Sequence, residues 1–519
     1  MPTEPETFYI TTPIYYVNDR PHIGHVYSST VADAVARFHR LQGDDTFFLT
    51  GTDEHAAKVV TAAAERGLGP QEWADRNAAA FQEAFARLGI SNDDFIRTSE
   101  ARHRERVTGY VRRLLDSGDV YLGEYEGWYD AGQEEYVPEN KAKESDFRSP
   151  INGQPLVRKS EHNAFFRLSA YRDALLELLE AGLVQPEARR NELLARVREG
   201  LNDVPVSRTG TQGWGIPVPG TPDQTIYVWI DALMNYLTTV DTDERLKYWP
   251  ADVHLIAKDI LWFHGVIWPA LLLALGRPVP RRVYAHSFWI RDGRKMSKSL
   301  GNFIDLEQID EYVGRFSLDA LRWFLLTQGP LGTTDADFAE PKFIEVYNSD
   351  LANTLGNSFS RVANMIGRYF GGQAPAGGAG EGGELRAAAE RCVASYRAAM
   401  DDLRLDDAAG AAMELVRGID GYIERTAPFK LARDPERMPE VGAILYDCAE
   451  AMRIASLLLW PVLPEKMEEV WRRIGGDAYL AAVAERGRGA LDEWTAWGLL
   501  EPGTPIAKGE ALFPRFQAP

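Results

Sequence analysis

Residues 8–25 read FYITTPIYYVNDRPHIGH, and this stretch sets the expectation for the fold. Aromatic and β-branched residues over Phe8–Thr12 predict a strand, which is followed by Pro13 and by turn residues at 18–21. A helix is expected from about His25 to Leu41, because apolar side chains recur there at helical spacing. A strand that passes through a turn into a helix is the opening unit of an α/β domain.

Similar units recur further along the chain. Short β-like runs occupy residues 46–50, 226–231, 254–257 and 283–290, and helical stretches, including most of 55–118, separate them. Strands that alternate with helices at this spacing predict an α/β domain built on a parallel sheet.

Two segments depart from this alternation. Residues 121–224 carry short aromatic and charged segments with turn signals, and they are interpreted as an insertion into the sheet domain. From about residue 345 the pattern is helical almost to the end, where a strand or extended arm is expected at 512–514. The predicted division is a sheet domain over 1–120 and 225–344, the insertion over 121–224, and an all-α domain with a C-terminal arm over 345–519.

The composition is that of a soluble globular protein of several domains, with 519 residues of which 45% are hydrophobic and 26% charged. No apolar run is long enough for a membrane span and no signal peptide is evident, so a cytoplasmic protein is expected. Cys392 and Cys448 are too few and too distant for a disulfide framework. The net charge of −19 alone argues against nucleic-acid binding, although binding depends on local patches.

His22-Ile23-Gly24-His25 lies where the turn passes into the first helix. The unpaired N–H groups and positive dipole end of a helix N-terminus suit phosphate. Two imidazoles three positions apart fall on the same side of the first turn, and Gly24 leaves room for a purine or ribose. For this motif on its own, an accidental histidine pair or part of a metal site is the alternative.

Residues 295–299 read KMSKS and follow the last β-like run. Two lysines with hydroxyls and flanking glycines make a cationic loop that can close on a polyphosphate and stabilise developing charge. A solvated basic loop is the alternative for this motif on its own. Together, about 270 residues apart and both at strand ends, the two motifs resemble the signature motifs of the class I aminoacyl-tRNA synthetases.

This resemblance implies a Rossmann-type catalytic domain that binds ATP with Mg²⁺ and assists attack of an amino-acid carboxylate on the α-phosphate. Positioning and charge stabilisation carry such chemistry, so no covalent protein nucleophile is expected. Catalytic roles are implied for His22, His25, Lys295 and Lys298, and Asp259 is implied to reach the ATP ribose. The implied ATP-binding residues are His22, Gly24, His25, Asp259, Lys295, Met296, Ser297 and Lys298.

Further blocks resemble the bacterial methionyl-tRNA synthetases: ITTPIYYVND at 10–19, GTDEH at 51–55, YVWIDAL at 227–233 and KDI at 258–260. Aromatic walls suit methionine because its thioether is long, flexible and polarizable. Asp53 is implied to hold the substrate ammonium group. The implied methionine pocket comprises Ile14, Tyr16, Asp53, Trp229, Ala232, Leu233, Tyr236, Ile260, Phe263 and His264. From composition alone, these aromatic residues would be interpreted as core.

The insertion lacks two features found in relatives of this class. Many methionine enzymes carry zinc knuckles there, but residues 129–155 contain no cysteine and no paired histidines, so no metal is predicted. At about 100 residues the insertion is also too short for the editing domain of leucine, isoleucine and valine enzymes, which favours methionine. Any rejection of homocysteine would then occur in the synthetic site.

The helical C-terminal part resembles the anticodon-binding domain of this family. Asn357 and Arg361 lie four positions apart on a helix face away from Leu355 and Phe359, and they are implied to contact anticodon bases. Phe429 stands where the family commonly has a tryptophan that stacks on a base, and a phenylalanine ring can still stack. Core packing is the alternative for Phe429.

The expected function is ATP-dependent attachment of methionine to initiator and elongator methionine tRNA through a methionyl-adenylate, by a monomer. Alternatives are a cysteine or leucine enzyme of the same class, a small nucleotidyltransferase with an HxGH loop, and a synthetase-like protein that binds tRNA without catalysis. The absent zinc ligands count against the cysteine enzyme, and the short insertion against the leucine enzyme. The C-terminal helices count against the nucleotidyltransferase, and two intact signature motifs against a non-catalytic protein.

Overall fold

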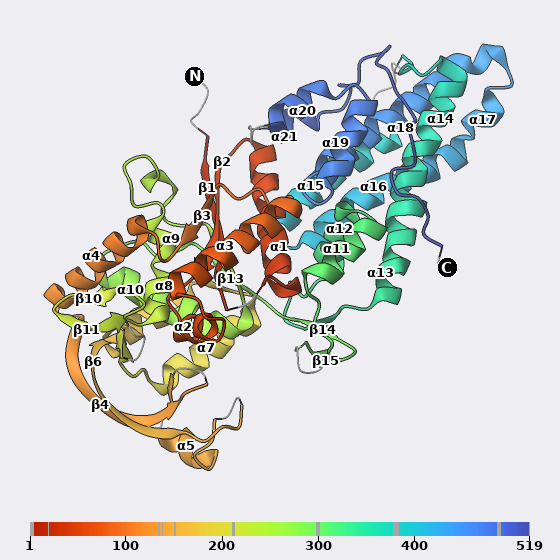
Figure 1. Cartoon of the computed structure of the whole chain (residues 1–519). Helices are drawn as coiled ribbons and strands as arrows, with labels where there is room; N and C mark the ends of the chain where they lie inside the picture. Colours follow the sequence, from red (N-terminus) through yellow and green to blue (C-terminus); the bar gives the residue numbers. More distant parts are fainter. Residues whose placement is uncertain are drawn as a thin grey trace.

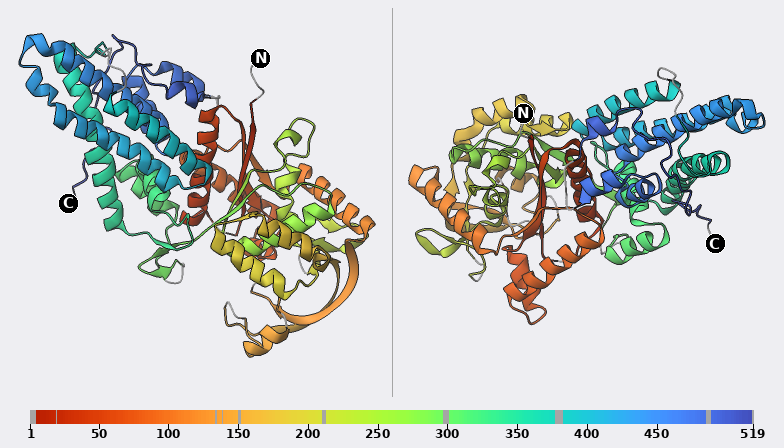
Figure 2. Two further views of the ribbon diagram at one scale, coloured as in Figure 1. Left: turned by 180° about the vertical axis from the view of Figure 1, so that it is seen from behind. Right: turned by 90° about the horizontal axis from the view of Figure 1, so that it is seen from above.

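The structure of the chain is a computed structural model that describes residues 5–18, 20–132, 135–137, 139–149, 152–209, 213–296, 301–376, 383–484 and 489–517. Figure 1 shows two lobes, a sheet domain from which a long hairpin arches away and an elongated helical bundle. The views from behind and from above in Figure 2 show the bundle beside the sheet domain, with helix α1 at the junction. This arrangement confirms the predicted fold class, a Rossmann-type parallel-sheet domain followed by a helical bundle.

A six-stranded parallel sheet forms the centre of the first lobe, in the order β3–β2–β1–β12–β13–β7. Its strands are β1 (Thr7–Tyr16), β2 (Asp45–Asp53), β3 (Asp94–Arg97), β7 (Val184–Gln185), β12 (Val253–Ala257) and β13 (Val283–His286). The strand order reverses between β1 and β12. In open α/β sheets this reversal places a ligand crevice at the carboxyl ends of the two strands.

Strand β1 is longer than the sequence predicts. It continues through Pro13 to Tyr16, and its register with β2 shifts between Thr11 and Ile14. Pro13 has no N–H to donate to the ladder, which explains why the pairing is interrupted there. The extra residues bring Ile14 and Tyr16 to the carboxyl edge of the sheet.

Helix α1 (Ile23–Gln42) follows the turn, close to its predicted bounds. Val31, Val35 and Phe38 are almost fully buried along it, which confirms the apolar stripe predicted for this helix. The helix ends at Gly43, whose φ of 107° is a conformation that glycine adopts at little cost.

Two β-like runs were assigned wrongly from the sequence. Residues 226–231 are not a strand, because β11 (Thr221–Ile226) ends there and helix α8 (Val228–Leu233) begins. A short buried apolar run has the same composition in a strand and in a buried helix, so periodicity could not separate them. The run at 283–290 forms two strands, β13 and β14 (Trp289–Arg291), with a break after His286.

Helices fill most of residues 55–118, as predicted, but strand β3 interrupts them. The helices are α2 (Ala57–Ala64), α3 (Pro70–Arg87) and α4 (Ala101–Ser117). Strand β3 pairs in parallel with β2 and has four residues, too few for a recognisable alternation of polar and apolar side chains.

The segment 121–224 contains a long hairpin and also one strand of the central sheet. Strands β4 (Val120–Asp130) and β6 (Val157–Phe166) make the long antiparallel hairpin, and α5 (Glu139–Glu144) lies at its tip (Figure 1). Strand β7, from the same segment, pairs with β13 and belongs to the central sheet. The other elements of the segment are β5 (Glu135–Val137), η1 (Leu168–Tyr171), α6 (Arg172–Glu180), α7 (Glu187–Glu199), β8 (Val204–Pro205), β9 (Ser207–Arg208), β10 (Pro217–Val218) and β11. The domain boundaries at 120, 224 and 344 stay a prediction.

The second lobe is helical, as predicted. Its main elements are α13 (Glu340–Val346), η6 (Tyr347–Gly356), α14 (Asn357–Phe370), α15 (Glu384–Asp401), α16 (Leu405–Thr426), α17 (Pro428–Leu431), α18 (Met438–Leu459), α19 (Pro464–Arg473), α20 (Asp477–Val483) and α21 (Leu491–Trp494). Residues 512–514 form an extended arm and no strand, and the Tyr347 hydroxyl donates a hydrogen bond of 2.7 Å to the Pro514 carbonyl. None of the helices in the described ranges combines the length and apolar character needed to cross a membrane.

A buried ion pair joins α1 to a helix that is itself hydrogen-bonded to the helical lobe. Asp33 of α1 lies 2.7 Å from a guanidinium nitrogen of Arg322 in α12 (Leu318–Gln328), and neither side chain is more than 1% exposed. Arg322 also donates to the carbonyl oxygens of Pro461 and Val462, which follow α18. Arg322 therefore links the helix that starts beside His22 to the helical lobe.

Candidate active site

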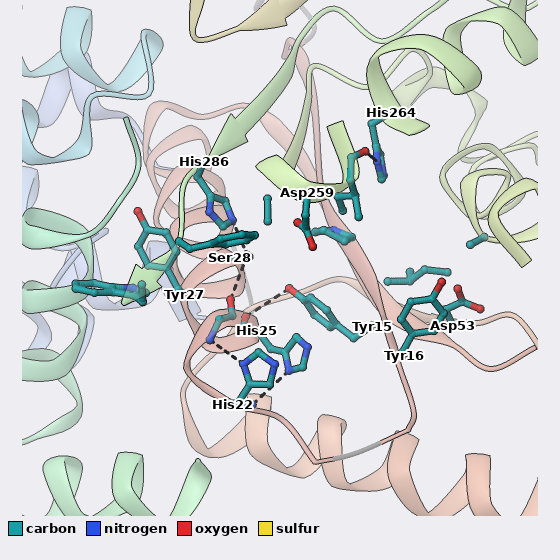
Figure 3. Close-up of a pocket in the computed structure, with 18 of the residues that line it drawn as sticks. Tyr15, Tyr16, His22, His25, Tyr27, Ser28, Asp53, Asp259, His264 and His286 are labelled. Atoms are coloured by element: carbon teal, nitrogen blue, oxygen red, sulfur yellow. Dashed lines mark hydrogen bonds between the residues drawn. The ribbon is translucent and has the colours of Figure 1, made fainter. Parts of the chain in front are cut away.

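A cavity of about 490 Å³ opens at the carboxyl ends of the central strands. Tyr16 of β1, Asp53 of β2, Ala257 of β12 and His286 of β13 all contribute to its wall. This is the position expected from the reversal of strand order. Figure 3 shows His22, His25 and His286 toward one end of the cavity and Asp53, Tyr16 and His264 toward the other.

His22 and His25 form a capping arrangement at the start of α1. Nδ1 of His22 accepts from the Gly24 amide at 3.1 Å, and Nδ1 of His25 accepts from the His22 amide at 3.3 Å. Burial lowers the pKa of His22 to about 4, and burial together with the His22 ring lowers the pKa of His25 well below its usual range. Both rings are therefore neutral at pH 7. With Nδ1 accepting, the proton of each neutral ring is on Nε2, which is the donor.

The chain that follows the KMSKS motif meets the start of α1. The Ile23 amide donates to the Ile304 carbonyl at 3.1 Å, and the Phe303 ring packs edge-on against His22 at 4.9 Å. Met296 is half-buried against the core. Ser297 and Lys298 lie outside the described residues.

Lys295 lies near two residues that line the cavity, Phe288 and Asp259. Lys295 belongs to β15 (Arg294–Lys295), and its ammonium group lies 5.7 Å from the ring centre of Phe288, which lines the cavity. Asp259 is in the short helix η3 (Lys258–Ile260) and also lines the cavity. Burial raises the pKa of Asp259, and the nearby Lys295 opposes this shift. Lys295 is exposed and does not itself line the cavity, so its electrostatic effect reaches Asp259 from the rim.

The other end of the cavity has the composition expected of a pocket for an apolar amino acid. Trp229 of α8 lies edge-on to Tyr16, with ring centres 6.1 Å apart. Of the predicted pocket residues, the cavity is lined by Ile14, Tyr16, Asp53, Trp229, Ala232, Leu233, Tyr236, Ile260 and His264. Phe263 of η4 (Phe263–Ile267) stacks on Trp229 at 3.9 Å and supports that wall from behind.

Tyr236 and His264 form a neutral polar pair in this pocket. Nδ1–H of His264 donates to the Ile260 carbonyl at 3.0 Å, so Nε2 accepts from the Tyr236 hydroxyl at 2.8 Å. Burial lowers the pKa of His264 to about 4, which keeps the ring neutral. A few oriented polar groups among apolar walls are typical of a small-molecule site.

A buried network that was not predicted supports α8. The Asp231 carboxylate accepts from Nδ1 of His55 at 2.6 Å and from Nε2 of His103 at 2.7 Å. Burial acts to raise the pKa of Asp231, but the two histidines outweigh it and lower the pKa to about 2. Because His55 follows the end of β2 and His103 lies on α4, the network fixes α8 against two other elements of the sheet domain.

Several residues that line the cavity were missed from the sequence. The segment after β13 contributes His286, Ser287, Phe288 and Trp289. Ser28 of α1 donates from its hydroxyl to Nε2 of His286 at 2.8 Å, since Nδ1–H of that ring donates to the Ser287 carbonyl at 2.7 Å. The available signal was the rule that carboxyl ends of parallel strands face the ligand, which a single uninterrupted strand at 283–290 concealed.

The residues expected to contact the anticodon lie in the helical lobe. Asn357 is exposed at the start of α14, and Arg361 pairs with Glu424 of α16 at 2.5 Å. The Phe429 ring, on α17, is 38% exposed, and Figure 1 places α17 at the end of the bundle far from the sheet. An aromatic ring that exposed is available for stacking, although a role in tRNA binding stays a prediction.

No metal-ligand cluster is present in the part of the chain that the structure describes. There, no group of three or more His, Cys, Asp or Glu side chains is arranged to hold an ion. The absence of zinc stays a prediction.

Comparison with known proteins agrees with this geometry. The family model described as tRNA synthetases class I (M) matches residues 8–146 and 142–363. The methionine–tRNA ligase of Bacillus subtilis is 41% identical, over 100% of this chain and 79% of its own length. That of Streptomyces coelicolor is 40% identical, over 99% of this chain and 97% of its own.

Among solved structures, methionyl-tRNA synthetase of Mycobacterium tuberculosis in complex with methionyl-adenylate superposes with a TM-score of 0.88. It is 37% identical and covers 98% of this chain and 100% of its own. With an intact HIGH motif at the expected helix start and full-length similarity of this order, the chain belongs to the methionyl-tRNA synthetases of class I.

Proposed function

We propose that the cavity binds methionine at the Asp53 end and ATP at the α1 end, and joins them there as methionyl-adenylate. One observation carries this proposal: a single cavity contains both the two neutral imidazoles at the start of α1 and an aromatic pocket with a buried carboxylate. The overall activity is that of the family, ATP-dependent attachment of methionine to tRNA.

At the amino-acid end, Asp53 binds the ammonium group of methionine. Its carboxylate is 2% exposed at the end of β2, and a charge-assisted hydrogen bond there is worth about 1.5–3 kcal/mol. The thioether lies between Trp229, Tyr236 and His264. The remaining wall is formed by Ile14, Tyr16, Ala232, Leu233 and Ile260, with Phe263 behind Trp229.

At the nucleotide end, the Nε2 donors of His22 and His25 face the phosphates, where the N-terminus of α1 adds its positive dipole. Gly24 leaves the backbone accessible to the nucleotide, and Asp259 binds the ribose. Lys295 and Lys298 neutralise the pyrophosphate, and Met296 and Ser297 complete the loop around it. Mg²⁺ accompanies ATP as part of the substrate.

The reaction needs no covalent enzyme intermediate. A carboxylate oxygen of methionine attacks the α-phosphorus, the bond from that phosphorus to the bridging oxygen breaks, and pyrophosphate leaves with the electron pair. A terminal hydroxyl of tRNA then attacks the methionyl carbonyl carbon and loses its proton, the bond from that carbon to the phosphate oxygen breaks, and AMP leaves with the electron pair. The neutral histidines donate hydrogen bonds to the phosphate oxygens as negative charge develops on them, and neither ring has to be protonated first.

For the tRNA, we propose that Asn357, Arg361 and Phe429 contact the anticodon of the initiator and elongator methionine tRNAs. The exposed Phe429 ring supports this assignment, since an aromatic face stacks on any base. Arg361 would exchange its ion pair with Glu424 for a contact with the nucleic acid. We further propose that the protein acts as a monomer in the cytoplasm.

ATP–pyrophosphate exchange with each of the twenty amino acids tests the assignment of the cavity. We expect exchange with methionine and an increase of about 10- to 100-fold in the methionine KM of Asp53→Asn, with the ATP KM little changed. Asp173→Asn is a matched control, because that side chain is 89% exposed on α6. Exchange driven by leucine or cysteine, or an Asp53→Asn variant with unchanged methionine KM, would refute the proposal.

A further inference from the structure

The hairpin that carries Lys295 is held by a carboxylate from a distant part of the sequence. Strands β14 and β15 pair in antiparallel fashion, with Ile290 opposite Lys295 and Arg291 opposite Arg294. Asp292 and Gly293 form the two-residue turn, with φ of 54° and 68°. Positive φ at both central residues is the signature of a type I′ turn, which suits a tight hairpin.

Asp337 binds both amides of this turn. Its Oδ1 accepts from the Asp292 N–H at 3.0 Å, and its Oδ2 accepts from the Gly293 N–H at 3.2 Å. One carboxylate thus satisfies the two donors at the point where the chain reverses. Both bonds are charge-assisted, and together they fix the hairpin in two directions.

The strand that carries Asp337 is itself firmly placed. Strand β16 (Ala336–Asp337) pairs in parallel with β14, and the amides of Ala336 and Phe338 donate to the carbonyls of Phe288 and Ile290. The Phe338 side chain is 2% exposed and packs edge-on against Trp289 at 5.4 Å. Asp337 therefore extends from a strand that is paired with β14 and followed by the buried Phe338, toward an exposed turn.

A second aspartate on the same segment holds the neighbouring wall of the cavity. Oδ1 of Asp335 accepts from the Phe288 amide at 2.9 Å and from the Lys258 ammonium at 2.6 Å. The Phe288 ring lines the cavity and has the Lys258 and Lys295 ammonium groups 4.9 Å and 5.7 Å from its centre. Asp335 thus holds the cavity wall at Phe288, and Asp337 holds the turn of the β14–β15 hairpin.

We propose that Asp337 is a positioning residue for adenylate formation, which acts by fixing the β14–β15 hairpin and through it the place of the Lys295 ammonium group. It does not touch substrate. The inference rests on the proposed role of Lys295 at the pyrophosphate. Without the carboxylate, the turn loses both of its acceptors and Lys295 samples positions away from the developing charge, while the methionine pocket, built on other elements, keeps its shape.

A displaced Lys295 beside an unchanged methionine pocket predicts a specific kinetic effect. Asp337→Ala should lower the kcat of methionine-dependent ATP–pyrophosphate exchange by about tenfold, since a misplacement of roughly 1 Å can cost about a hundredfold. The methionine KM should stay within about twofold of the wild type. A role in stability alone would instead lower the melting temperature and leave the kcat of the folded enzyme unchanged.

A second variant of the same turn, a double variant and two matched controls complete the experiment. Gly293→Ala disturbs the same turn from its other side, because alanine disfavours a φ of 68° while its added methyl group meets nothing within 4 Å. It should reproduce the kinetic effect, and the double variant should be less than additive. Gly503→Ala, with φ of 88° and equally open surroundings, and Glu345→Ala, a 67% exposed carboxylate on α13, are the matched controls.

The outcomes separate the proposals. A wild-type enzyme with no ATP–pyrophosphate exchange, or with exchange stimulated by another amino acid, would overturn the function proposed above. An active wild type with Asp337→Ala and Gly293→Ala both within twofold of its kcat would overturn this inference alone. An equal rise in the methionine and ATP KM values, with kcat unchanged, would also contradict it, and a kcat loss restored by Asp337→Glu would support it.

Discussion

Replacement of Asp231 by asparagine should both destabilise the sheet domain and weaken methionine binding. The carboxylate is fully buried and accepts from His55 and His103 at 2.6 Å and 2.7 Å. An amide can accept only one of these N–H groups and turns its own N–H₂ toward the other. We therefore expect one hydrogen bond to be lost with its donor left unsatisfied, and the other to become a weaker, uncharged bond.

The magnitude can be worked out from the pKa of Asp231. The two histidines outweigh burial and lower it from the ordinary 3.8 to about 2, and each pKa unit corresponds to about 1.4 kcal/mol. The ionised carboxylate thus contributes about 2 kcal/mol, or roughly 4–8 °C in the melting temperature of a domain of this size. Because the pKa is lowered on folding, this contribution is fully present above about pH 4 and is lost as the pH falls toward 2.

Differential scanning fluorimetry between pH 3 and pH 7 measures this effect. The melting temperature of Asp231→Asn should lie several degrees below that of the wild type at pH 7, and the gap should narrow as the pH falls below 4. The methionine KM should rise about five- to tenfold, because α8 carries Trp229, Ala232 and Leu233. Asp173→Asn should match the wild type throughout. A pH-independent gap, or no gap, would refute the reasoning.

Three other perturbations test separate parts of the molecule. Phe429→Ala should lower kcat/KM for tRNA charging by about tenfold or more and leave ATP–pyrophosphate exchange unchanged. Phe429→Trp should retain charging, because its ring can still stack on a base. Equal charging by the two variants would exclude a stacking role for Phe429. Arg322→Met should destabilise the protein by about 1–3 kcal/mol in guanidinium unfolding. Asp33 keeps its ion pair with Arg37, but it loses the one with Arg322, and the buried carbonyls of Pro461 and Val462 lose their donor; an unchanged free energy of unfolding would contradict this. The rate of exchange should not change between pH 6 and 8 through titration of His22, because burial lowers the pKa of His22 to about 4. A fall in rate below about pH 6.5 in the wild type that is absent from His22→Gln would contradict the neutral imidazole.

The sequence predicted most of the elements that carry the site. Helix α1 and the apolar stripe along it followed from periodicity, and nine of the ten residues expected in the methionine pocket line one cavity. Only the resemblance of short blocks to a known family pointed to this grouping, since an aromatic residue such as Trp229 has the same local pattern in a core. Their role in binding methionine stays a prediction.

Contacts between distant segments could not be predicted. Asp231 pairs with His55 and His103, which lie 176 and 128 positions away in the sequence. Asp337 binds the turn at 292–293, which lies 45 and 44 positions away. Such contacts leave no periodic pattern of apolar residues in the sequence. Strand β7 escaped prediction for a related reason, because two residues acquire their strand character only from the partner strand β13.

Charging of an unfractionated tRNA pool, with each of the twenty amino acids supplied in turn with ATP, tests the central claim most directly. We expect methionine to be esterified to tRNA, with the charged species identified by sequencing as the initiator and elongator methionine tRNAs. Stable esterification of a different amino acid, or formation of an adenylate that is never transferred to tRNA, would contradict the account.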